Sequence, residues 1–235
     1  MKGKLIVFEG TDASGKSAQI ELLVNKLNKK KIKCVLVHHP NYKSPFGALV
    51  GQYLAGTFGQ LGKLPTEIVF LLYSLDRYQF KQTYTDILKK GKFILADRYT
   101  ESALGFQTAL YHNLDKEPFL AWMREVDSRL PQSDMVVFLN MHPKIRAMLE
   151  EERSKKLKYS KDREYLGDLK KDIHEQSDKF QEQVRQTYID LAKREPKRWL
   201  VVDCFKESNE GPQIKTVEEI HNEIWIQVQK RFDIE

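Results

Sequence analysis

Short apolar runs alternate along this chain with longer stretches in which apolar residues recur every three or four positions. Five runs of five or six residues are almost wholly apolar, which is typical of strands buried on both faces of a sheet. They are LIVFE, CVLVH, FILAD, MVVFLN and WLVVD, at positions 5–9, 34–38, 93–97, 135–140 and 199–203. This pattern predicts a five-stranded parallel sheet.

The stretches between these runs have the spacing of helices. In 16–30, for example, Ile20, Leu23 and Leu27 fall on one helical face. The segment 65–91 opens with Pro-Thr-Glu and closes on a glycine, so we predict one long helix there. Further helices are predicted over 46–56, 117–130, 143–156 and 216–231. Strands that alternate with helices predict an α/β fold of three αβα layers with right-handed crossovers.

The composition indicates one folded domain over residues 1–235. Hydrophobic residues make up 41% and charged residues 31% of the chain, which excludes a disordered protein. Cys34 and Cys204 lie in apolar runs and are interpreted as buried thiols. The apolar run near the N-terminus is too short for a signal peptide or a membrane span, so we expect a cytoplasmic protein with no membrane partner.

The net charge of +6 fits either a solvated lysine-rich surface or a protein that binds phosphate groups. The lysines are spread along the chain rather than gathered in one basic stripe, so no nucleic-acid partner is expected. Their densest cluster lies in 153–175, which is rich in charge and poor in apolar residues. This segment is either a solvated connection between helices or a lid that covers phosphates.

The stretch GTDASGKS, residues 10–17, follows the first predicted strand and opens the first predicted helix. It matches the spacing G-x-x-x-x-G-K-[ST] of a phosphate-binding loop, in which backbone N–H groups and a lysine hold phosphate oxygens. The helix that begins here adds the positive end of its dipole. We therefore predict a P-loop NTPase-type fold that binds ATP through Gly10, Thr11, Asp12, Ala13, Ser14, Gly15, Lys16 and Ser17.

A magnesium site is predicted beside this loop. Such sites combine the loop serine, here Ser17, with an acid at the end of another strand, and FILAD ends in Asp97. A GTPase of the Ras type is not favoured, because RYT follows the aspartate where Asp-x-x-Gly would be required and no Asn-Lys-x-Asp motif is present.

Two charged residues near the loop favour phosphate transfer over simple binding. Asp12 lies inside an anion-binding loop, where a carboxylate makes sense only if it faces a second substrate or a water on magnesium. Arg98 follows Asp97 directly, and transfer between two anions requires a cation between them.

Four stretches in order resemble the thymidylate kinase family: FEGTDASGKS, LLYSLDR, DRYTESALGFQ and DIHEQSDKFQEQVRQTYIDLA. The resemblance covers nearly the whole chain. It implies transfer of the γ-phosphate of ATP to dTMP with Mg²⁺, a helical lid at about 153–175, and a homodimer.

The resemblance also implies roles for residues on the acceptor side. Asp12 matches the residue that contacts the acceptor 3′-hydroxyl, and Glu9 supports it. Tyr73 matches the aromatic residue that stacks on thymine, and Arg77 the arginine that reads the base. Arg98 matches the arginine that bridges donor and acceptor phosphates. The remaining matched positions on the base and sugar side are Ser102, Gln107, His174 and Glu175.

The ring of His174 is expected to exclude a ribose 2′-hydroxyl. One family subtype places a catalytic basic residue in the phosphate loop and another places it in the lid. Ala13 and Ser14 occupy the loop position here, so Arg153 in the lid is predicted to be the catalytic residue.

One stretch departs from the family pattern. Where Phe-Pro and an arginine that holds the acceptor phosphate are usual, this chain has HHPNYKSP. We count Tyr42 among the substrate-binding residues. Either Lys43 or His39 replaces the arginine, or the binding of the acceptor is altered. Ala103 also departs from the usual residue. Two alternatives to dTMP kinase therefore stay open: a kinase for another monophosphate such as dUMP or dGMP, and a non-catalytic nucleotide- or nucleic-acid-binding protein.

Overall fold

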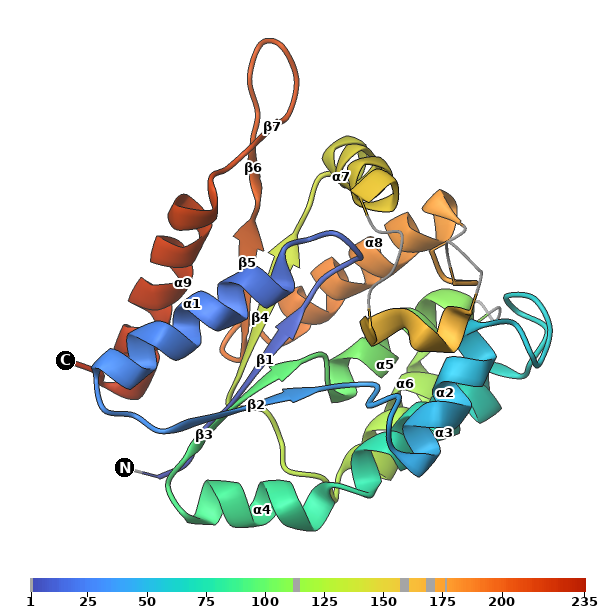
Figure 1. Ribbon diagram of the computed structural model, residues 1–235, viewed down its shortest axis with the longest axis horizontal. Coiled ribbons are helices and arrows are strands. Elements are labelled where there is room, and N and C mark those ends of the chain that lie inside the picture. The colour runs from blue at the N-terminus through green and yellow to red at the C-terminus, as the bar shows by residue number, and fades with distance from the viewer. Residues whose placement is uncertain (1, 112–114, 157–160, 168–171, 176) are drawn as a thin grey trace.

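The computed structural model describes residues 2–111, 115–156, 161–167, 172–175 and 177–235, without the side chains of 153–163. All five predicted strands are confirmed at their predicted bounds: β1 (Leu5–Glu9), β2 (Cys34–His38), β3 (Phe93–Asp97), β4 (Met135–Asn140) and β5 (Trp199–Asp203). They form one parallel sheet in the order β2-β3-β1-β4-β5 (Figure 1). The predicted α/β class is therefore confirmed.

One face of the sheet is covered by α1 (Lys16–Lys29) and α9 (Val217–Phe232), as Figure 1 shows. Alternate strand side chains such as Phe8 and Val137 point into this layer, where they pack on Leu23 of α1 and Ile224 of α9. These residues are fully buried. The packing fixes the start of α1, and with it the phosphate loop, against the end of β1.

The opposite face carries α5 (Thr100–Leu110), α6 (Glu117–Asp127) and α8 (Asp178–Arg194). The intervening strand residues, such as Val136 and Phe138, pack here on Tyr188 of α8. Helix α8 begins after Ser177, whose hydroxyl accepts a hydrogen bond from Phe180 N. The structure also has α7 (Pro143–Lys156), whose end enters the segment 153–175 that is predicted as a lid, and the short 3-10 helix η1 (Lys161–Leu166) within that segment. The role of the segment as a lid stays a prediction.

The prediction of one long helix over 65–91 is wrong. The structure has two helices, α3 (Thr66–Tyr78) and α4 (Lys81–Lys89). The helix is interrupted at Gln79 and Phe80, because the side-chain amide of Gln79 donates hydrogen bonds to Ser44 and Asp76. The ring of Phe80 is stacked on Tyr84. The break turns α4 under β3 and leaves α3 beside α2 (Pro45–Leu54).

One helix and one hairpin were not expected from the sequence pattern. Helix α5 follows β3 almost without a connection, and β6 (Phe205–Lys206) pairs with β7 (Gln213–Ile214) in a hairpin that projects from the molecule (Figure 1). Cys34 and Cys204 are free thiols as predicted, the first half-buried and the second buried. Within the described residues, no helix is long and apolar enough to cross a membrane.

Candidate functional site

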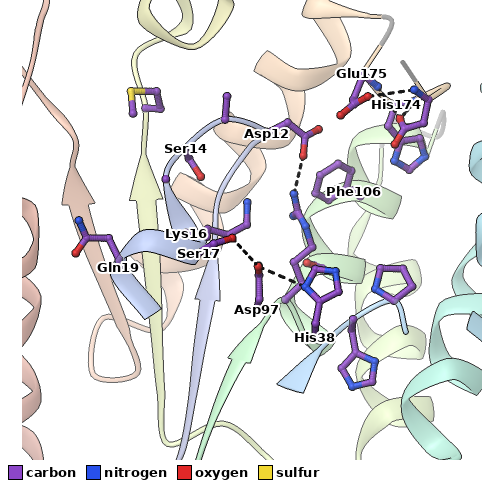
Figure 2. Close-up of a pocket in the computed structure, with 18 of the residues that line it drawn as sticks. Asp12, Ser14, Lys16, Ser17, Gln19, His38, Asp97, Phe106, His174 and Glu175 are labelled. Carbon is purple, nitrogen blue, oxygen red and sulfur yellow. Dashed lines mark hydrogen bonds and ion pairs between the residues drawn. The ribbon is translucent and has the colours of Figure 1, made fainter. Parts of the chain in front are cut away.

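A cavity of about 690 Å³ opens at the carboxyl ends of β1, β2 and β3. This is the edge of a parallel sheet at which ligands bind in open α/β folds. Its floor is the loop between β1 and α1, and Figure 2 shows side chains of several distant segments pointing into it. Residues 12–19 of the predicted phosphate loop and of α1 line the cavity.

The loop backbone has the conformation that a phosphate cradle requires. Ala13 and Gly15 have positive φ angles of 58° and 83°, and alternation with ordinary angles turns successive N–H groups toward one side. Gly15 immediately precedes α1, whose positive dipole end faces the cavity. A Cβ atom added at Gly15 would meet nothing within 4 Å, so this position stays open for a ligand.

Lys16 curls back over the loop. Its ammonium group donates to the carbonyls of Gly10 and Thr11, each at 3.2 Å. Burial, together with the charge of Arg98, lowers the pKa of Lys16 to about 8. An anion in the cradle would restore the positive charge fully, since it favours the protonated amine.

Asp97 and Ser17, the two residues predicted to hold magnesium, lie next to each other. The hydroxyl of Ser17 lies 3.5 Å from Asp97 Oδ2, and the ring of His38 lies 3.4 Å from the same oxygen (Figure 2). Burial opposes ionisation of Asp97, but the hydrogen bond from His38 and the charges of Lys16 and Arg98 lower its pKa to about 2. The buried Oδ1 has no hydrogen-bond partner among the described residues. An ionised carboxylate with a vacant oxygen beside a hydroxyl fits a hard divalent cation.

Arg98 stands at the centre of the cavity. One guanidinium nitrogen is 3.0 Å from Asp12 Oδ1, and the other is 3.8 Å from Glu9 Oε2. The guanidinium also lies 5.0 Å above the ring of Phe106. Burial alone would lower the pKa of Arg98, but the surrounding carboxylates raise it, so the cation is permanent. Its Nη1 has no hydrogen-bond partner within the described part of the chain, which leaves a donor for a ligand.

Glu9 is buried and forms an ion pair with Arg98. Its carboxylate accepts hydrogen bonds from Tyr99 N, Ser102 Oγ and Tyr188 Oη, at 3.1, 2.6 and 2.8 Å. Burial raises the pKa of Glu9 to about 7, although Arg98 and the hydrogen bonds act in the other direction. Glu9 does not line the cavity, so its effect on a ligand passes through Arg98 and Ser102.

The end of the cavity away from the phosphate loop is aromatic. Tyr42, Tyr73, Phe106 and His174 line it. The ring of His174 is stacked on Phe106 at 5.4 Å, and its Nε2 lies 3.1 Å from the hydroxyl of Tyr53. Burial lowers the pKa of His174 to about 4, so this ring is neutral. The result is a slot that suits a flat base next to a permanent cation.

A model of the thymidylate kinase family matches residues 8–213 of the chain. The chain belongs to the thymidylate kinase family. It is 35% identical to the thymidylate kinase of Schizosaccharomyces pombe over 159 residues, which cover 66% of this chain and 71% of that protein. It is 28% identical to that of Plasmodium falciparum over 229 residues, covering 97% and 91%. The solved thymidylate kinase of Candida albicans superposes with a TM-score of 0.70 at 25% identity, over 100% of this chain and 94% of that one.

The family shows that this protein is an enzyme of the P-loop kinase fold. Several residues that the resemblance singled out line the cavity together, although they come from distant segments. They are Asp12, Tyr42, Tyr73, Arg98, Ser102, Gln107, His174 and Glu175. Gln107 is buried with its Oε1 unpartnered among the described residues. The individual roles of these residues remain predictions.

Arg77 does not line the cavity. Its guanidinium is 1% exposed and donates to Asp127 on α6 at 2.6 Å. Asp127 also accepts a hydrogen bond of 2.6 Å from Ser74, one turn of α3 earlier. In this structure Arg77 therefore joins α3 to α6, and its assignment as a reader of the acceptor base stays a prediction.

The segment that departs from the family pattern places no lysine or arginine among the described residues that line the cavity. Lys43 is exposed and does not line it. His39 does line it, but its ring nitrogens lie 2.6 Å from Asp76 Oδ2 and 2.9 Å from Tyr84 Oη. Burial lowers the pKa of His39 although Asp76 acts in the opposite direction. The expectation that one of these residues supplies the replacing charge therefore finds no support here.

The lid assignment is only partly visible. The backbone of Arg153 belongs to α7, but its side chain lies outside the described residues, so the predicted catalytic role is untested. At the end of the predicted lid segment, Asp172 accepts hydrogen bonds from His174 N and Glu175 N at 2.8 and 2.9 Å. Burial and the charges of Glu175 and Asp12 raise the pKa of Asp172 well above its usual range.

Sequence reasoning missed several residues that shape the site. Gln181 on α8 donates to Asp12 Oδ2 at 3.1 Å and so orients the carboxylate that pairs with Arg98. Gln19 donates to the carbonyl of Val217 at 2.9 Å and joins α1 to the start of α9. The part of the cavity beside the start of α9 is apolar and is lined by Met141, Leu149, Ile214, Val217 and Ile220. The β6–β7 hairpin, which no sequence pattern announced, supplies part of this wall.

Proposed function

We propose that this enzyme transfers the γ-phosphate of ATP to dTMP and gives dTDP and ADP. The observation that carries the proposal is the position of Arg98. This permanent cation lies in one continuous cavity that holds the phosphate loop at one end and the aromatic slot of Tyr73 and His174 at the other. Two anionic substrates can be brought together only where a fixed cation separates them.

The reaction needs no side chain as nucleophile. An oxygen of the acceptor phosphate attacks the γ-phosphorus, and the bond from that phosphorus to the bridging oxygen breaks, so that the electron pair leaves with ADP. Lys16 and Arg98 stabilise the negative charge that spreads over the transferred group. Closure of the lid over the phosphates excludes water and so suppresses hydrolysis of ATP.

Magnesium is part of this proposal. Ser17 and Asp97 would hold it, because the unpartnered Asp97 Oδ1 and the nearby hydroxyl of Ser17 are oxygen ligands of the kind that Mg²⁺ prefers. When bound, the ion neutralises charge on the outer phosphates of ATP. Arg153 in the lid is proposed to add a further positive charge.

The acceptor assignments follow the order of the cavity. We infer that Tyr73 stacks on thymine and that Gln107 and Ser102 bind its polar atoms or the sugar. Asp12 and Glu175 would face the sugar 3′-hydroxyl. His174 would crowd the 2′ position, which favours a deoxynucleotide.

A homodimer is also proposed, and one surface supports it. Ile68, Leu71 and Leu75 lie on one face of α3 and are 45%, 40% and 42% exposed. Three large apolar side chains at this spacing form a stripe of the kind that subunit contacts cover. A cytoplasmic location completes the proposal, because ATP and deoxynucleotides are the proposed substrates.

The deciding experiment is a steady-state assay that follows ADP with ATP and Mg²⁺. The acceptors are dTMP, dUMP, UMP, dGMP and dCMP, with a reaction lacking acceptor as control. We expect dTMP to lead by about tenfold or more in kcat/KM, which corresponds to about 1.4 kcal/mol of transition-state binding. If another monophosphate leads, the acceptor is wrong. If ADP forms equally without acceptor, transfer itself is refuted.

Two variants make this assay specific. Lys16→Ala serves as the blank, and Arg98→Lys tests the central cation. Lysine keeps the charge but not the planar set of donors, so kcat with dTMP should fall by about a hundredfold. Arg185→Lys is the matched control, because Arg185 pairs with Glu182 on α8 outside the cavity lining. An equal loss in both variants would mean that the effect is not local to the site.

A further inference from the structure

We propose that Asp76 and His39 form a buried positioning pair that sets the shape of the acceptor side of the cavity through residues 39–44. This inference rests on the proposed function, since it concerns how the acceptor nucleotide is bound. It also accounts for the departure HHPNYKSP, in which a histidine stands where phenylalanine is usual.

The carboxylate of Asp76 binds several residues of the segment 39–44. It is completely buried on α3. His39 Nδ1 lies 2.6 Å from Oδ2, the backbone N–H of Asn41 donates at 3.2 Å, and the hydroxyl of Ser44 donates to Oδ1 at 3.1 Å. Gln79 adds a fourth donor at 3.1 Å. A buried carboxylate is tolerated only when donors surround it in this way.

The ring of His39 has no freedom to leave this arrangement. It lies within 6.0 Å, centroid to centroid, of the rings of Phe80, Tyr84 and Tyr99. Its Nε2 is 2.9 Å from the hydroxyl of Tyr84. A neutral ring that donates from Nδ1 to Asp76 and accepts at Nε2 from Tyr84 satisfies every polar atom in the contact. Phenylalanine could fill the same space but could not bind Asp76.

The pair is connected directly to the cavity wall. His39, Pro40 and Tyr42 all line the cavity. Tyr42 is stacked on Tyr165 of η1 with ring centroids 4.1 Å apart. Ser44 caps the N-terminus of α2 through a hydrogen bond from Gly47 N. Anchoring of the segment at both ends therefore fixes where Tyr42 meets the lid region.

This role differs from that of an arginine at the same place. No cation among the described side chains of this segment lines the cavity. The segment can therefore contribute to acceptor binding through the position of its backbone and of Tyr42, which Asp76 determines. Loss of the pair should weaken acceptor binding without disturbing the phosphate loop on the other side of the cavity.

Two variants of nearly equal shape test the inference. His39→Asn keeps an N–H donor close to the position of Nδ1, whereas His39→Leu has a similar size and no donor. Both lose the ring and the contact with Tyr84. We expect His39→Leu to raise KM for dTMP about tenfold, or about 1.4 kcal/mol, while KM for ATP stays within about twofold. His39→Asn should recover most of the affinity for dTMP. Equal KM values for dTMP in the two variants would overturn the proposal.

A double-mutant cycle with Asp76 supplies the second readout. Asp76→Asn and His39→Leu should each raise KM for dTMP, and the combined variant should be about as impaired as the worse single variant, because both remove one interaction. Multiplied effects would show that the residues act independently. Calorimetric titration of dTMP into each variant checks that KM reflects binding.

General loss of stability is controlled by a distant variant. Val228→Ala creates a cavity in the layer between α1 and α9 and should lower Tm without changing KM for dTMP. If it raises that KM as much as His39→Leu does, the pair is merely structural. If the wild-type protein phosphorylates no monophosphate, the proposed function fails. If it is active but His39→Leu is not impaired for dTMP, only this inference fails.

Discussion

Protonation of His174 connects the acceptor slot to the stability of the fold. Burial lowers the pKa of this ring to about 4, against about 6.5 in an unfolded chain. Below pH 6.5 the unfolded chain binds a proton that the folded protein does not. The contribution of His174 to stability is therefore present above pH 6.5 and is lost as the pH falls toward 4.

The variant His174→Phe should remove this loss. Between pH 8 and pH 5, His174 lowers the free energy of unfolding of the wild type by about 2 kcal/mol. Relative to the wild type, the free energy of unfolding of the variant should therefore be about 2 kcal/mol higher at pH 5 than at pH 8. Urea unfolding at the two pH values measures it. Val228→Ala is the control, because it destabilises the distant layer between α1 and α9 and removes no titrating group. Its effect on stability should be equal at both pH values, and parallel curves for His174→Phe would contradict the assignment.

Some residues of the site could be predicted from the sequence alone and others could not. The loop of residues 10–17 has a fixed spacing, and Asp97 and Arg98 end an apolar run, so all of them could be placed on the site in advance. Gln181 could not, because its contact with Asp12 spans 169 positions of the chain and no short pattern encodes it. The pairing of His39 with Asp76 was hidden for the same reason.

Among the elements, the strands were the most predictable. Burial on both faces leaves β1, β3 and β4 almost no polar positions, and this makes their bounds visible in the sequence. The failure over 65–91 has the opposite cause. The apolar spacing of α3 continues into α4, and the break depends on the bonds of Gln79 to Ser44 and Asp76. The hairpin β6–β7 is short and polar, so it left no periodic signal.

The exposed apolar stripe of α3 can be tested as the dimer contact. Leu71 lies in the middle of the exposed apolar stripe, and a charge there would have to be buried in the proposed dimer contact at high cost. Leu71→Arg should therefore halve the mass measured by light scattering, from twice 27.6 kDa to a single chain. Leu36→Arg on β2 is the matched control, since Leu36 is 58% exposed and lies outside the stripe. A dimer that survives Leu71→Arg would exclude this face as the interface.

The whole molecule places two chemically different ends in one cavity. The phosphate loop belongs to the sheet and to the layer of α1 and α9. The aromatic end belongs to α2, α3 and the segment before α8, which pack in a separate cluster around Tyr53, and to Phe106 of α5, which belongs to the core beneath α8. Because each end has its own supporting core, we expect the two substrates to stabilise the protein independently. Arg98 is the main point that they share.

This separation can be measured through ligand-linked stability. At about 100 times its dissociation constant, a ligand adds about 2.7 kcal/mol to the stability of the folded state. For a chain of this length that corresponds to a rise in Tm of about 5–10 °C. ATP with Mg²⁺ and dTMP, added separately, should each produce such a rise in differential scanning calorimetry.

A variant at one end of the cavity should abolish the Tm shift caused by one substrate and leave the shift caused by the other. Lys16→Ala removes a charge from the phosphate loop, so it should abolish the shift with ATP and leave the shift with dTMP. Tyr73→Leu removes an aromatic face from the other end and should have the reverse effect. If either variant reduces both shifts equally, the cavity behaves as one cooperative site, and the assignment of donor and acceptor to its separate ends is wrong. If only ATP ever shifts the Tm, the aromatic end does not bind dTMP.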